Sequence, residues 1–178
     1  MANDFLNNFY QVTVGSLELT ANHDIKQIVH VTEDYEKYKL LIQSLKEYDD
    51  GGRKIVFVET KRGCDQLARS VKMEGFQVHC IHGDKSQEER DWALREFREG
   101  RVSMLVATDV AARGLDIKDI KMVFNFDMPG NIEDYVHRIG RCGRAGNTGI
   151  AVSFFTQKSA KLASELLRIM REANQQIP

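Results

Sequence analysis

The sequence predicts an α/β fold, a single domain built on a parallel sheet with helices on both faces. Short apolar runs recur along the chain, and stretches with apolar residues at helical spacing separate them. The runs at 55–58 and 104–107 are wholly apolar, which is typical of strands buried on both faces. Strands that alternate with helices in this way form parallel sheets through right-handed crossovers. At 178 residues the chain is long enough for one well-packed domain and short for two.

Each expected element has its own signal. Six strands are expected, at residues 28–31, 55–58, 78–81, 104–107, 122–124 and 151–155. The first helix is expected to bury one side that holds Tyr35, Tyr38, Leu41, Leu45 and Tyr48, and the second a side that holds Cys64, Leu67, Ala68 and Val71. The last helix is expected to bury Ala163, Leu166, Leu167 and Met170. The interval between the strands at 104–107 and 122–124 is expected to be non-helical.

Several helix ends are marked by single residues. Gly75 is expected to follow the end of the second helix in a left-handed conformation. Ser86 and Glu89 are spaced as a capping box, which predicts a helix that begins there and ends before Gly100. Asn131 is expected to cap a helix whose first turn carries two acidic residues, where the positive end of the helix dipole favours them.

The composition limits the class of protein. The formal net charge is −1, so any contact with a polyanion must come from local basic clusters. The three cysteines have no C-x-x-C spacing, which argues against a disulfide framework or a zinc site and favours a reducing compartment. No apolar run approaches membrane-spanning length, so no membrane contact is expected. Residues 1–24 show no clear period and are expected to form a linker or the end of a preceding domain, with the domain itself at 25–178.

The most informative stretch is 137–144, His-Arg-Ile-Gly-Arg-Cys-Gly-Arg. Helical spacing places Ile132, Tyr135, Val136 and Ile139 toward the core, with Arg141 opposite and His137 and Arg138 at the flanks. A helix end with three arginines and two glycines is typical of a phosphate site, because guanidinium forks fit phosphate oxygens. The alternative is a solvated basic face, which is the usual fate of a run of charges.

Other candidate residues come shortly after the expected strands. Thr60 follows the strand at 55–58, Gly83 the strand at 78–81, and Thr108 the strand at 104–107, while Gln87 and Arg90 lie in the first turn of a capped helix. In parallel sheets ligands gather beyond the carboxyl ends of the strands, and helix N-termini accept phosphates. Taken singly, Gln87 and Arg90 fit ordinary surface residues and Asp116 fits a turn. Because all of these residues are expected at the same edge of the sheet, together they favour a binding surface there.

Two features of nucleotide sites are missing from the sequence. There is no G-x-x-x-x-G-K-[ST] loop, and no acidic pair ends a buried strand as a magnesium site would require. His82 and His137 have no partner at metal-ligand spacing, so both are interpreted as hydrogen-bonding residues, and no metal site is expected. The sequence thus predicts half of a nucleotide site, which requires a partner domain.

These residues carry a family resemblance over nearly the whole chain. The chain resembles the C-terminal RecA-like domain of DEAD-box ATP-dependent RNA helicases. Residues 137–144 match the family's motif VI, residues 108–116 motif V and residues 55–60 motif IV, while Gln87-x-x-Arg90 matches its phosphate-contacting motif. Two segments, ETKRGCD and IHGDKSQEERDWALREF, resemble the nuclear branch linked with splicing and ribosome biogenesis. Residues 3–19 resemble the end of the family's first domain and its linker.

The resemblance implies a role for each matching position. Arg141 and Arg144 would be arginine fingers that reach the γ-phosphate, with His137 as a further catalytic residue. His137 and Arg138 would also couple the two domains. Asp116 would bind the ATP ribose. The RNA backbone would be held by Thr60, Gly83, Gln87, Arg90, Thr108, Arg113 and Gly114. ATP with Mg²⁺ would be bound mainly by the first RecA-like domain of the same protein. Cys142 stands where threonine is common in the family.

The resulting expectation is the C-terminal half of an ATP-dependent RNA helicase that is inactive alone. RNA contacts through hydroxyl, main-chain and arginine groups carry no sequence code, so binding is expected to be sequence-independent. The protein is expected to be a monomer in the nucleus or the cytoplasm. Two alternatives stay open: a free-standing RNA-binding or regulatory module, and a DNA-directed relative.

Overall fold

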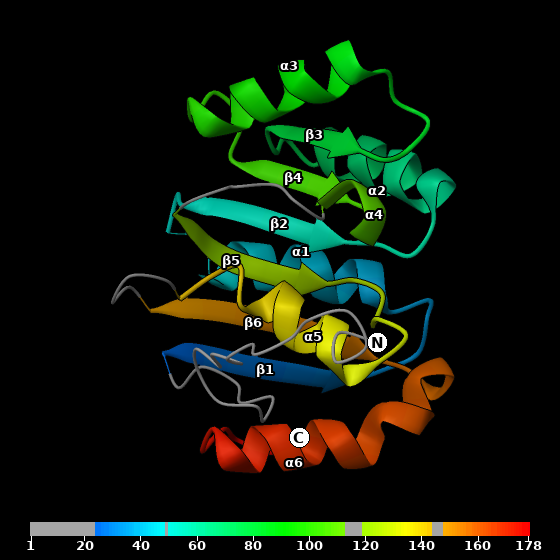
Figure 1. Cartoon of the computed structure of the whole chain (residues 1–178), viewed down its shortest axis with the longest axis vertical. Helices are drawn as coiled ribbons and strands as arrows, with labels where there is room; N and C mark the ends of the chain where they lie inside the picture. The colour runs from blue at the N-terminus through cyan, green and yellow to red at the C-terminus, as the bar shows by residue number, and fades with distance from the viewer. Residues whose placement is uncertain (1–23, 49, 113–118, 144–147) are drawn as a thin grey trace, which may run out of the picture.

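A six-stranded parallel sheet forms the centre of the molecule (Figure 1). The structure is a computed structural model that describes residues 24–48, 50–112, 119–143 and 148–178. The strands lie in the order β1-β6-β5-β2-β4-β3, and every neighbouring pair is parallel. Their bounds are β1 Ile25–Val31, β2 Arg53–Phe57, β3 Val78–Ile81, β4 Met104–Ala107, β5 Ile120–Asn125 and β6 Gly149–Phe155. All six carboxyl ends therefore meet at one edge of the sheet.

Helices cover both faces of the sheet. Their bounds are α1 Lys37–Tyr48, α2 Lys61–Met73, α3 Gln87–Arg98, α4 Asp109–Ala112, α5 Ile132–Ile139 and α6 Ala163–Glu172, with the 3₁₀ helix η2 Gln157–Leu162 before α6. Successive strand residues point to opposite faces. In β2, Ile55 and Phe57 belong to the apolar cluster beneath α3, α5 and α6, whereas Val56 belongs to the cluster beneath α1 and α2. The predicted α/β fold is confirmed.

Two of the six expected strands and several helix ends have the predicted bounds, whereas β1, β2, β5 and β6 begin two or three residues earlier than expected. β3 and β4 have the predicted bounds, and Cys64, Leu67, Ala68 and Val71 form the buried side of α2. The φ angles of Gly75 and Gly100 are +91° and +74°, as expected for residues that end helices. Both halves of the capping box are present: Ser86 Oγ accepts from Glu89 N–H at 3.1 Å, and Glu89 Oε2 accepts from Ser86 N–H at 2.7 Å.

Three expectations about local structure are wrong. Tyr35 precedes α1 and is 81% exposed, because the helix begins only at Lys37. In α6 the buried residues are Leu166, Ile169 and Met170, so Ile169 belongs to the core and Leu167 lies at its edge. The interval after β4 contains α4, a single turn that is too short to produce a periodic pattern.

No helix among the described residues has the length and apolar character needed to cross a bilayer. The three cysteines are free thiols. The expected linker, residues 1–24, falls almost entirely outside the described residues and stays a prediction.

Candidate functional site

The carboxyl edge of the sheet brings together the predicted polar residues that follow β2, β3 and β4. Thr60 caps α2, and its Oγ1 accepts a hydrogen bond from Gly63 N–H at 3.0 Å. Thr108 is 6% exposed, lies at the start of α4 and accepts Ala112 N–H through its carbonyl at 3.0 Å. β2 pairs with β4 and β4 pairs with β3, so the two threonines and Gly83 follow three adjacent strands. The predicted shared edge is confirmed for these positions.

Gly83 lies on the surface beside Lys61, a lysine to which the sequence interpretation assigned no role. A Cβ at Gly83 would lie 3.5 Å from Lys61 Cε, so the lysine stem runs alongside the glycine. Lys61 Nζ also forms an ion pair with Asp84 at 2.5 Å, and both side chains are more than half exposed. The signal for Lys61 was its place directly after Thr60, in the first turn of α2. A cation beside an exposed glycine is suited to a phosphate, because the backbone can approach closely there.

Gln87 and Arg90 lie together in the first turn of α3. Arg90 Nη2 donates to Gln87 Oε1 at 2.6 Å, and Gln87 Nε2 donates to Asp91 Oδ1 at 2.8 Å. Arg90 Nε is buried and has no hydrogen-bond partner. The chain of side-chain bonds holds the guanidinium in a fixed orientation while leaving part of its donor set available.

Arg138 is buried, although its position in the helix predicted a place at the flank of the core-facing side. It is 4% exposed, and its Nε and Nη2 bind the two oxygens of Asp109, each at 2.7 Å. Its Nη1 donates to Asn125 Oδ1 at 3.1 Å and to the Asp127 carbonyl at 2.6 Å, and the guanidinium stacks over Phe57 at 4.8 Å. The expectation that all three arginines of residues 137–144 serve one phosphate site is therefore wrong for Arg138. It lies three residues after the buried Tyr135, which turns it toward the sheet.

His137 and Arg141 line a small hollow together with Arg138. The hollow is also lined by Asp109 and Asp134. Gly143, which follows, has a φ of +67°, and a Cβ there would come within 2.6 Å of Ile25 Cγ1. This glycine is therefore required by packing against β1, so its presence does not by itself indicate a ligand.

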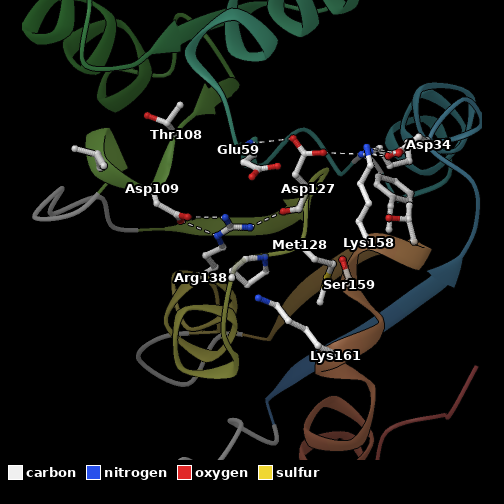
Figure 2. Close-up of a pocket in the computed structure, with 16 residues that line it drawn as sticks. Asp34, Glu59, Thr108, Asp109, Asp127, Met128, Arg138, Lys158, Ser159 and Lys161 are labelled. Atoms are coloured by element: carbon white, nitrogen blue, oxygen red, sulfur yellow. Dashed lines mark hydrogen bonds and ion pairs between the residues drawn. The ribbon is translucent and has the colours of Figure 1, made fainter.

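A larger cleft of about 410 Å³ opens over the ends of β4, β5 and β6. Figure 2 shows Thr108, Asp109 and Arg138 at one end and Asp34 and Lys158 at the other. Between these groups an ionic network spans the cleft. Lys37 Nζ lies 2.6 Å from Asp127 Oδ1 and 3.0 Å from Asp34 Oδ1. Lys158 Nζ lies 2.5 Å from Asp34 Oδ2, and Asp127 Oδ2 accepts a hydrogen bond from Glu59 N–H at 2.9 Å. Hydrogen bonds from Lys158 and Lys37 hold the pKa of Asp34 below its usual value. The sequence interpretation missed this network because its members are remote in sequence: Lys37 begins α1, Lys158 lies in η2, and the others lie in separate loops.

A second polar cluster lies between α2 and the end of β3. Asp65 Oδ2 and His82 Nε2 are 3.0 Å apart, Cys80 Sγ donates to Asp65 Oδ1 at 3.3 Å, and Lys85 Nζ lies 3.0 Å from the same Oδ1. Burial raises the pKa of Asp65, but hydrogen bonds from Lys85, His82 and Cys80 outweigh it and lower the pKa to about 2. His82 is thus a hydrogen-bonding residue, as expected. Its neighbours were not foreseen, because Asp65 is remote in sequence.

Comparison with known proteins identifies the family. Residues 36–146 match the helicase conserved C-terminal domain family. The chain is 55% identical to the ATP-dependent RNA helicase DBP2 of Lodderomyces elongisporus over all of this chain and 33% of that protein. Among solved structures, the Escherichia coli DEAD-box protein SrmB, bound to regulator of ribonuclease activity A, is 37% identical with a TM-score of 0.72, and the match covers 85% of this chain and 87% of that one. The chain belongs to the DEAD-box helicase family.

The yeast DEAD-box splicing factor Prp28 gives a further structural match to this DEAD-box domain. It has a TM-score of 0.81 and 38% identity over 92% of this chain and 35% of the Prp28 chain. The chain thus spans about a third of the length of the curated relatives that it matches. The predicted RecA-like fold is confirmed by these structures.

Four predicted site residues of this DEAD-box chain lie outside the described residues. They are Arg113, Gly114, Asp116 and Arg144. The roles expected for them, and for the described members of the same motifs, stay predictions.

Proposed function

We propose that this chain is the C-terminal half of an ATP-dependent RNA helicase and that it works only against a first RecA-like domain of the same protein. ATP and RNA would bind across the cleft between the two domains. The observation that carries this proposal is the convergence of Thr60, Gly83 and Thr108 on one sheet edge, with His137 and Arg141 beside it. The family membership supports the same arrangement.

On the RNA side we assign the residues predicted from the family motifs. The described members are Thr60, Gly83, Gln87, Arg90 and Thr108, and the others are Arg113 and Gly114. We add Lys61 because its stem lies against Gly83. A hydroxyl, a main-chain N–H and charged side chains read phosphates and not bases, so binding would be independent of sequence. An RNA substrate fits the relatives, which are named as ATP-dependent RNA helicases, and we expect this protein in the nucleus or the cytoplasm.

On the ATP side we assign Arg141 and Arg144 as arginine fingers, His137 as their catalytic neighbour and Asp116 as the ribose contact. Among the described residues, His137 and Arg141 are suited to a polyphosphate because both side chains line the same hollow. Of the two carboxylates among the described residues that line this hollow, Asp109 already binds Arg138 with both oxygens, so only Asp134 is left and there is no acidic pair for Mg²⁺. We therefore assign the nucleotide and its Mg²⁺ mainly to the first domain. Guanidiniums stabilise charge on a transferring phosphoryl group that is held elsewhere.

Arg138 would couple the ATP side to the RNA side through contacts within this domain. It joins α5, which carries His137, to Asp109 at the start of α4, directly after Thr108. A shift of α5 when ATP binds would therefore be transmitted to the segment that holds RNA. This assigns the predicted coupling role of Arg138 to a contact within the chain.

The proposal is tested in a two-domain protein in which this chain is joined to the first RecA-like domain of a DBP2 relative. Arg141→Lys keeps the charge and loses the planar fork, so kcat should fall by something on the order of 10³-fold, the low end for arginine fingers. The same result is expected for Arg144→Lys. Single-stranded RNA affinity without nucleotide should stay unchanged in both variants. Near-normal turnover would make these arginines solvated surface residues and contradict the assignment.

Arg90→Ala is the matched variant on the RNA side. It should weaken RNA binding for all sequences and reduce the slope of log affinity against log salt concentration by about one unit. Basal ATP hydrolysis should be unchanged. Equal stimulation of ATP hydrolysis by DNA and RNA would favour the DNA-directed relative, and binding to one sequence with a flat salt response would favour a free-standing RNA-binding module.

A further inference from the structure

We propose that Asp65, Cys80 and His82 form a binding site for a divalent transition-metal ion, and that Zn²⁺ is the ion that fits these donors. A carboxylate oxygen of Asp65, Sγ of Cys80 and a ring nitrogen of His82 all lie within 4.8 Å of one another. Asp65 holds the set together, since its two oxygens lie 3.3 Å from Cys80 Sγ and 3.0 Å from His82 Nε2. The three donors thus surround one point.

The fold places the three donors in α2, in β3 and directly after β3. Cys80 and His82 are two residues apart along the line of β3, so their side chains share one face of the sheet. That face is covered by α2, whose second turn carries Asp65. The side chain of His82 is 5% exposed and that of Asp65 is 36% exposed. Asp65 and Cys80 also line a surface hollow, which gives an ion a path from solvent.

The donor types select the metal. Thiolate, imidazole and carboxylate are the protein ligands of Zn²⁺, whereas Mg²⁺ and Ca²⁺ prefer oxygen donors alone. Three protein ligands leave a fourth tetrahedral position for water. Cys64 is not a fourth ligand, because its Sγ is directed to the carbonyl oxygens of Val106 at 3.3 Å and Ile81 at 3.6 Å.

Metal binding would move two protons. The Cys80 thiol would lose its proton to solvent as the sulfur–metal bond forms. Asp84 N–H donates to His82 Nδ1 at 3.3 Å, so Nε2 carries the ring proton in the metal-free state. Coordination through Nε2 transfers that proton to Nδ1, and the hydrogen bond from Asp84 opens. The amide of Asp84 therefore reports on coordination by the imidazole.

Nearby cations set the strength of the site. Lys85 Nζ lies 3.0 Å from Asp65 Oδ1 and competes with a metal ion for that carboxylate. Lys85 is only partly buried, so it can move to solvent when an ion binds. Arg69 and Lys72 line the same hollow and lower the local concentration of cations. We therefore expect weaker binding than at a closed structural zinc site.

The test is a titration of the chelator-treated chain with Zn²⁺ by calorimetry and with Co²⁺ by absorption spectroscopy. We expect one saturable site, a sulfur-to-cobalt charge-transfer band in the near ultraviolet, and a shift of the Asp84 amide resonance. Cys80→Ser should abolish the band and weaken binding by more than about 10-fold, the smallest loss typical even for an outer-shell change. Cys142→Ser, at a buried thiol on the other side of the sheet, should leave both unchanged.

Substitution of two nearby lysines distinguishes competition for the Asp65 carboxylate from a general effect of positive charge on Zn²⁺ binding. Lys85→Ala should tighten Zn²⁺ binding several-fold because it removes the competing ammonium, whereas Lys72→Ala should change it less. Each variant must unfold at the midpoint of the parent chain in the presence of chelator. Absence of a saturable site in the parent chain, a cobalt spectrum without the sulfur band, or unchanged affinity in Cys80→Ser would each overturn the proposal.

Discussion

Arg138 shows how a single side chain determines the arrangement of the site. Its guanidinium is buried, binds both oxygens of Asp109 and reaches Asn125 and the Asp127 carbonyl. The forked geometry of arginine allows all of these bonds at once, and lysine would make only some of them. The residue therefore fixes α5 relative to the ends of β4 and β5.

Asp109→Asn should destabilise the chain, because it leaves the Arg138 charge buried without its carboxylate. We expect a loss of roughly 3 kcal/mol in the free energy of unfolding, the lower end for a broken buried ion pair, since the Asp109 side chain is 31% exposed and water can partly replace it. Urea unfolding measures this value. Asp91→Asn, on the exposed surface of α3, is the control and should change stability by less than about 0.5 kcal/mol. A loss below about 1 kcal/mol in Asp109→Asn would mean that the pair contributes little.

At the scale of elements, the caps and turns are what the sequence predicted best. The capping box of α3 and the glycines that end α2 and α3 are local features, so a few adjacent residues determine them. Contacts between remote elements were not predictable in the same way. The pairing of Arg138 with Asp109, the network around Lys37 and the cluster of Asp65 with His82 depend on which loops the sheet brings together. Sequence spacing alone does not contain that information.

Ser86→Ala should remove one half of the capping box and leave orphan N–H groups at the start of α3. The expected loss is about 1 kcal/mol in the free energy of unfolding. Ser70→Ala, inside α2, is the matched control and should be neutral or slightly stabilising, because alanine is the better helix former. Equal effects of the two substitutions, measured by urea unfolding, would show that the cap observed at Ser86 does not stabilise α3.

The acidic half of the same box gives a pH dependence. Hydrogen bonds from Ser86 lower the pKa of Glu89, so its folded value lies below its unfolded value. Its contribution to stability is therefore present above the unfolded pKa and is lost as the pH falls through the folded pKa. In Glu89→Gln this part of the acid dependence should disappear while the cap geometry remains, since glutamine also serves in capping boxes. An unchanged acid dependence, measured as unfolding midpoints across pH, would exclude Glu89 as a contributor.

At the scale of the whole molecule, the carboxyl edge of the parallel sheet is the surface to which the proposed function assigns RNA and ATP. Thr60, Gly83 and Thr108 follow adjacent strands there, and the hollow with His137 and Arg141 lies beside them. The formal net charge of −1 gives no general attraction to a polyanion, so the RNA binding that we propose would depend on a few phosphate contacts. The sequence also contains no G-x-x-x-x-G-K-[ST] loop, so in the proposed function Arg141 and Arg144 would act on a nucleotide that a first domain holds.

The most direct test of this account is RNA-stimulated ATP hydrolysis, measured for this chain alone, for the first RecA-like domain of a DBP2 relative alone, and for the two joined. We expect turnover only in the joined protein, because the nucleotide and the arginines then meet across one cleft. ATP hydrolysis by this chain alone, retained through repurification and lost in Arg141→Lys, would contradict the central claim that it is half of a shared site.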